Sequence, residues 1–142
     1  MSVIESRMTR RDRPAATEGF TLIELLVVMS LLVILASIGI ATYNSSVLRG
    51  REAVLKQDLF HMRDAIDQHY ADKSKYPLTL QDLVSAGYLR RVPEDPMTGS
   101  ADTWETIMSE PDPNNPAEEP GVYDVRSGSE RVALDGSKYS EW

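Results

Sequence analysis

The first half of the chain carries two hydrophobic patterns that follow each other without a break. Residues 20–40 are almost uniformly apolar, and a helix of that length spans about 31 Å, roughly the hydrocarbon core of a membrane. Residues 41–75 instead have the spacing of an amphipathic helix, with apolar residues at Leu48, Leu55, Leu59, Met62, Ile66 and Tyr70. The two patterns predict one long helix, of which the first part is transmembrane and the second part packs on the rest of the chain.

The remainder, residues 76–142, has the features of a small globular part. Pro77 disfavours helix at the residue before it, so the long helix is expected to end there. The stretch LTLQDLVSAG predicts a short helix with Thr79 as its N-cap and Gly87 as its C-cap. The predicted organisation therefore has four regions: residues 1–19, 20–40, 41–75 and 76–142.

Short apolar or alternating runs between turn-forming residues predict strands in the globular part. Residues 103–109, 122–127 and 131–134 fit this pattern. Residues 110–121 hold four prolines and four acidic residues, which is typical of an exposed loop. The predicted fold class is α+β, with the long N-terminal helix packed on a small antiparallel sheet.

Composition and charge narrow the classes of function. The net charge is −7 over 142 residues, which argues against nucleic acid as a partner, since that requires a basic face. The chain has no cysteine, which excludes disulfides and thiolate metal sites. His61 and His69 are expected to be solvated residues of the long helix. Catalytic motifs of hydrolases, metalloproteases and phosphate-binding loops are absent from the sequence, so we expect no enzymatic activity.

Glu24 is the one charged residue of the apolar run. A carboxylate at the centre of a membrane costs on the order of 2.5–3.5 kcal/mol, and less near the edge, so it is expected to have a partner. A cleaved secretory signal, a plain signal anchor or a buried core helix would each explain the run, but none of them requires Glu24. Glu24 could also reach the lipid headgroups and have no further role.

The stretch EGFTLIELLVVMSLL resembles the N-terminal signature of type IV pilins and of the pseudopilins of type II secretion. The resemblance implies that residues 1–19 are a leader, which a membrane-embedded prepilin peptidase removes between Gly19 and Phe20. It also implies that Phe20 is N-methylated. Glu24 would then neutralise the new amine on a neighbouring subunit and set the register of assembly, because either charge is costly when unpaired in apolar surroundings.

Two later stretches, YPLTLQDLVSAGYLRRVPEDPMTGS and GVYDVRSGSERVALDGSKYSEW, resemble the major pseudopilin of type II secretion. The resemblance implies a type IV pilin-like fold and a homopolymeric periplasmic fibre that drives protein export. The implied partners are other copies of the chain, minor pseudopilins and an assembly platform in the bacterial inner membrane. The expected topology is a single span, with a cytoplasmic N-terminus favoured by the basic leader and a periplasmic C-terminal part. A type IV pilus subunit for adhesion or motility, and a plain signal-anchored binding domain, are the alternatives.

Major pseudopilins bind calcium in a C-terminal loop through aspartates and backbone carbonyls. Asp135 is the clear carboxylate match in this chain, with Ser127, Ser129 and Glu130 nearby. The family's adjacent aspartates before the last tryptophan are missing, since the chain ends KYSEW. A calcium ion is therefore an expectation that follows from the resemblance, and a simple turn at Asp135 is the alternative.

Overall fold

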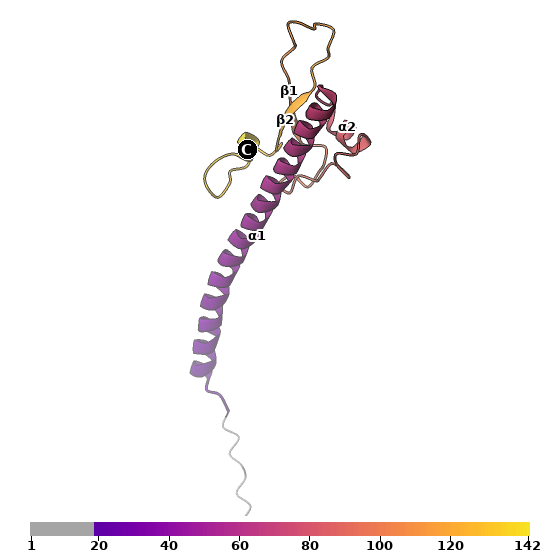
Figure 1. Ribbon diagram of the computed structural model, residues 1–142. Helices are drawn as coiled ribbons and strands as arrows, with labels where there is room; N and C mark the ends of the chain where they lie inside the picture. Colours follow the sequence, from indigo (N-terminus) through magenta and orange to yellow (C-terminus); the bar gives the residue numbers. More distant parts are fainter. Residues whose placement is uncertain (1–18) are drawn as a thin grey trace, which may run out of the picture. The chain divides into compact units, whose positions relative to one another are not determined.

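The computed structural model describes residues 19–142 (Figure 1), so all but the last residue of the expected leader lies outside the described residues. The chain divides into two units, Met1–Ile40 and Ala41–Trp142. Five elements follow one another in the sequence: α1 (Leu22–Lys73), α2 (Leu80–Ser85), β1 (Glu105–Met108), β2 (Val122–Arg126) and a short 3-10 helix, η1 (Tyr139–Glu141).

In the first unit, the part of α1 up to Ile40 exposes its apolar side chains all around. By length and composition, α1 is the one helix in the described part of the chain that could cross a membrane. The hydroxyls of Ser30 and Ser37 donate to Leu26 O and Val33 O at 2.8 and 2.7 Å, one turn back along the helix. These polar groups are thus satisfied within the helix, as a membrane environment requires.

In the second unit, the later part of α1 supplies one side of the hydrophobic core. The predicted apolar stripe is confirmed at Leu55, Leu59, Met62 and Ile66, which are all buried. It is wrong at Tyr70, which is 46% exposed and stacks on Tyr76. The facing side of the core comes from the globular part, mainly Leu80, Leu83, Trp104, Val122, Val125, Ala133 and Tyr139.

His69 corrects the expectation of a solvated histidine. It is 7% exposed, and its Nδ1 lies 2.8 Å from Lys75 O. The ring also packs edge-on against Tyr88, at 5.4 Å between ring centroids. His69 lies three residues after Ile66 and so continues the buried stripe where α1 ends, because side chains three residues apart share one face of a helix.

The short helix α2 is confirmed where the sequence predicts it. Thr79 forms a capping box: its hydroxyl accepts from Asp82 N, and the Asp82 carboxylate accepts from Thr79 N. Gly87 follows the helix with φ +85°, a left-handed conformation that glycine adopts without strain. Leu80 and Leu83 are buried, which fastens α2 to the core.

Within residues 19–142 the sheet is antiparallel and has two strands, β1 and β2, which pair in register from Glu105 opposite Arg126 to Ile107 opposite Asp124; a one-residue shift then places Met108 opposite Val122. The expected third strand at 131–134 is wrong, because that segment forms only an isolated bridge between Val132 and Lys138. Its backbone turns back at Gly136 instead. The α+β class is confirmed, with α1 on one side and a sheet smaller than expected.

Candidate functional site

The N-terminal motif lies where α1 begins. Gly19 and Phe20 precede the helix in non-helical backbone and are exposed. Thr21 acts like an N-cap, since its hydroxyl accepts from Glu24 N at 3.2 Å. Glu24 lies in the first turn, where the exposed amides of a helix favour a negative charge. The motif thus places an exposed peptide bond, Gly19–Phe20, shortly before a capped helix.

The Glu24 carboxylate is exposed among apolar neighbours such as Ile23 and Leu25. Within the part of the chain that the structure describes, it has no hydrogen-bond or ion-pair partner. In an apolar environment this group would require a partner from another molecule. The geometry therefore agrees with a role between molecules, although this predicted role stays untested.

The four C-terminal residues expected to bind calcium fall into two separate groups. Ser127 and Ser129 are buried. Ser127 Oγ donates to Asp95 Oδ2 at 2.5 Å and accepts from Ser129 N at 3.2 Å. Asp95, which is 0% exposed, also accepts from Met97 N at 2.8 Å. This first group is a closed network that ties the loop before β1 to the segment after β2.

The second group is exposed. Glu130 Oε2 pairs with Lys138 Nζ at 3.3 Å. Asp135 Oδ1 accepts from both the backbone and the hydroxyl of Ser137, at 2.9 and 2.6 Å. These hydrogen bonds lower the pKa of Asp135 from its ordinary value. Asp135 thus forms the turn that the alternative interpretation predicted.

Three side chains of α1 hold the C-terminal segment, and we call Glu52, Lys56 and Arg63 the C-terminal clamp. Glu52 Oε1 accepts from Leu134 N and from the Tyr139 hydroxyl, both at 2.8 Å. Burial and this hydrogen bond to Glu52 raise the pKa of Tyr139 to about 12. Glu52 therefore fixes the start and the end of the segment's turn with one carboxylate oxygen.

The two basic members of the clamp act on Trp142. Lys56 Nζ lies 4.5 Å from the centroid of the Trp142 ring, within the range of a cation–π interaction. Arg63 Nη2 donates to Trp142 O at 2.6 Å and to Val125 O at 2.9 Å, while its Nε pairs with Asp124 at 2.7 Å. Arg63 thus joins α1, β2 and the C-terminal residue.

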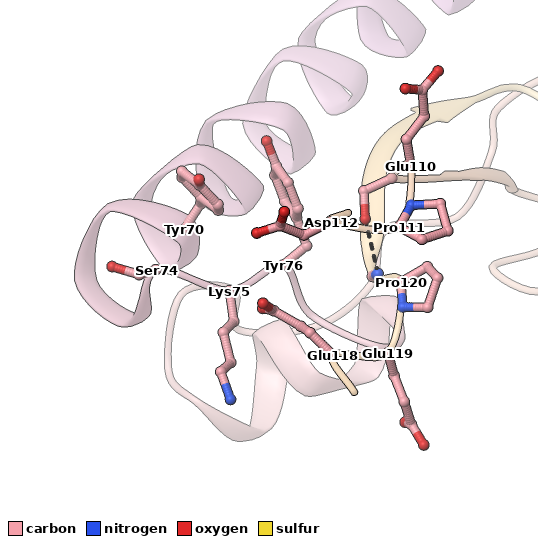
Figure 2. A pocket seen from close by; sticks show the side chains of 12 residues that line it. Tyr70, Ser74, Lys75, Tyr76, Glu110, Pro111, Asp112, Glu118, Glu119 and Pro120 are labelled. Carbon is pink, nitrogen blue, oxygen red and sulfur yellow. Dashed lines mark hydrogen bonds between the residues drawn. The ribbon is translucent and has the colours of Figure 1, made fainter. Parts of the chain in front are cut away.

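A pocket of about 300 Å³ lies between the end of α1 and the loop that joins β1 to β2. Figure 2 shows Tyr70, Ser74, Lys75 and Tyr76 on one side and the acidic, proline-rich loop on the other. The loop closes on itself where Gly121 N donates to Ser109 Oγ at 3.1 Å. Carboxylates, tyrosines, serines, prolines and one lysine line this pocket.

Comparison with known proteins identifies the family. Residues 15–40 match the prokaryotic N-terminal methylation motif. The chain is 35% identical over 94 residues to a type II secretion system core protein G of Klebsiella pneumoniae, an alignment that covers 55% of this chain and 67% of that protein. The protein of the same name from Pseudomonas aeruginosa is 32% identical over 105 residues, which cover 63% of this chain and 71% of that protein. The protein of the same name from Klebsiella michiganensis is 30% identical over 103 residues, which cover 61% of this chain and 72% of that protein. The chain belongs to the type II secretion system core protein G family.

Core protein G is the major pseudopilin, so the resemblance found in the sequence is confirmed. No solved structure matches this one. The methylation motif spans Gly19, Phe20 and Glu24. Cleavage, methylation and the assembly role of these residues stay predictions.

The donor set tests whether calcium, the ion expected for a major pseudopilin, fits this chain. Calcium takes six to eight oxygen ligands, several of them charged. The Ser127 hydroxyl donates to Asp95, the Ser129 hydroxyl accepts from Arg131 N, and the two acidic residues have partners of their own. In residues 19–142, every buried side-chain nitrogen or oxygen has a hydrogen-bond partner, so no buried side-chain oxygen is left free for an ion. The residues present do not fit a calcium site.

The clamp and Asp95 are functional positions that the sequence did not reveal. Glu52, Lys56 and Arg63 look like the ordinary charged face of an amphipathic helix, because their partners lie more than 60 residues away. Asp95 stands in a proline-rich loop, where aspartate usually forms exposed turns. No local signal points to Glu52, since its partner Tyr139 lies 87 residues further along the chain.

Proposed function

We propose that this chain is a subunit of the pseudopilus, a periplasmic helical fibre that drives protein export by type II secretion. The observation that carries the proposal is the N-terminal motif on an exposed apolar helix, in a chain of the core protein G family. Residues 20–40 need a cover, which lipid provides before assembly and the helices of other subunits provide in the fibre. The interior of the fibre thus replaces lipid as the apolar environment of residues 20–40.

Processing and location follow from the same motif. Prepilin peptidase cuts between Gly19 and Phe20, and Phe20 is then methylated. Before assembly the subunit crosses the inner membrane once, with the basic leader on the cytoplasmic side and Ala41–Trp142 in the periplasm. Minor pseudopilins and an inner-membrane assembly platform are its further partners.

Glu24 pairs with the amine of Phe20 on a neighbouring subunit. Cleavage creates this positive charge four residues before the carboxylate, about one turn of the helix away. Both charges enter apolar surroundings in the fibre, where an unpaired charge is strongly unfavourable and a close pair is tolerated. The pairing would therefore fix how far each new subunit advances along the fibre.

Fibre formation by Glu24 variants tests the proposal. We expect Glu24→Ala and Glu24→Gln to lower the yield of fibres at least tenfold, with no change in the melting temperature of the globular part. Ser30→Ala is the matched control, since that hydroxyl bonds only within its own helix among the described residues. Electron microscopy and sedimentation of sheared fibres measure the yield. Normal fibres from Glu24→Ala would contradict the register argument.

A further inference from the structure

Side chains of α1 hold the C-terminal segment, residues 131–142, in place. The clamp residue Glu52 binds Leu134 N and the Tyr139 hydroxyl. At the other end of the segment, Lys56 and Arg63 bind the ring and the carbonyl of Trp142. Each end of the segment is thus fixed to α1.

The turn in the middle of the segment has its own internal support. Asp135 binds Ser137, and Ser137 Oγ accepts from Trp142 Nε1 at 2.7 Å. Trp142 also packs edge-on against Tyr139, at 5.1 Å between ring centroids. Asp135 is therefore a positioning residue: through Ser137 it orients the indole that Lys56 covers.

The carboxylates of Glu130, Asp135 and the clamp residue Glu52 already have partners within the chain. Residues 127–142 contain three acidic and two basic residues, a net charge of −1, and the clamp together with Asp124, the ion-pair partner of Arg63, contains two acidic and two basic residues. Calcium affinity depends on the number of charged ligands that a site offers. Here Lys138 already pairs with Glu130, and Lys56 and Arg63 already lie on Trp142.

We propose that this chain closes its C-terminal segment with its own cations, Lys56, Arg63 and Lys138, and that its folding is independent of calcium. The proposal departs from the expectation that the family resemblance raised, and it concerns the unassembled subunit. Its test therefore does not depend on whether the chain forms fibres.

The experiment is thermal unfolding of the full chain in detergent micelles, followed by tryptophan fluorescence. The protein is melted in EDTA, in 5 mM calcium chloride and in 5 mM magnesium chloride, the last as a control for ionic strength. A site with a dissociation constant of about 1 mM, typical of extracellular calcium modules, would raise the melting temperature by about 4 °C or more. We expect the calcium and magnesium values to agree within about 3 °C.

Variants of the clamp show whether its side chains stabilise the C-terminal segment. Arg63→Met and Lys56→Met are each expected to lower the melting temperature by the same amount in EDTA and in calcium. A calcium-specific rise of about 3 °C or more in the unmodified chain, or about one calcium per chain in elemental analysis of protein purified without chelator, would overturn the proposal. A smaller rise with no bound calcium supports it. Asp135→Asn adds a second readout. If Asp135 were a calcium ligand, this variant would lower the melting temperature more in calcium than in EDTA; we expect the same change in both.

Discussion

Replacing Glu52 with alanine should destabilise the globular part strongly, although Glu52 lies on the partly exposed surface of α1. The substitution leaves the Tyr139 hydroxyl without its acceptor in a side chain that is 0% exposed, which costs about 1–3 kcal/mol. Leu134 N also loses Glu52, but it is exposed and water replaces the acceptor, at a cost of about 0.5 kcal/mol. We therefore expect the free energy of unfolding to fall by about 2 kcal/mol, or roughly 10 °C in melting temperature.

A double-mutant cycle with Tyr139→Phe isolates the hydrogen bond. Phenylalanine keeps the ring and removes the hydroxyl, so Glu52→Ala in that background should cost only about 0.5 kcal/mol. Glu52→Gln is the matched control, because the amide oxygen can still accept both hydrogen bonds, and it should cost under about 1 kcal/mol. Chemical unfolding of the full chain in micelles measures the four proteins of the cycle and the Glu52→Gln control. If Glu52→Ala cost the same with and without the hydroxyl, the clamp would not act through Tyr139.

Other regions give further expectations. Burial and Glu52 raise the pKa of Tyr139 to about 12, above its ordinary value of about 10. The folded state thus holds this proton more tightly. The contribution of this tighter binding to the free energy of unfolding, no more than about 3 kcal/mol, is complete below pH ~10 and is lost as the pH rises to about 12. Tyr139→Phe should remove this step from stability measured against pH. A Cβ added at Gly128 would overlap Thr103 O, so Gly128→Ala should lower stability by about 2 kcal/mol. Gly50→Ala, in open space on α1, should raise it by up to ~1 kcal/mol; equal melting temperatures for these two variants would contradict the packing described here.

The local elements could be predicted because local patterns decide them. The long helix follows from a continuous apolar run and then a stripe at helical spacing, and Thr79 and Asp82 define the start of α2 by a capping box that is readable in the sequence. The segment 131–134 was misjudged for the same reason. Its apolar residues fit a strand, but its position is decided by the distant Glu52 and by the turn before Gly136, and no local pattern contains these contacts.

The candidate site likewise has one part that the sequence predicts and one part that it does not. Gly19, Phe20 and Glu24 form a contiguous motif whose function depends on neighbouring residues, so a sequence can reveal it. The C-terminal residues were grouped by their nearness in sequence. Folding separates them, because Ser127 and Ser129 are buried, with Ser127 bonded to the buried Asp95, while Asp135 is exposed. His69 is buried although it is polar, because its place on α1 continues the buried stripe.

The intact mass of the protein purified from membranes shows whether this chain is a processed subunit of a type II secretion fibre. The protein should be expressed with and without prepilin peptidase. We expect the peptidase to remove residues 1–19 and one methyl group to be added to Phe20, while the leader stays attached when the peptidase is missing. An unprocessed leader in the presence of active peptidase would rule out this processing and leave Glu24 without its proposed partner.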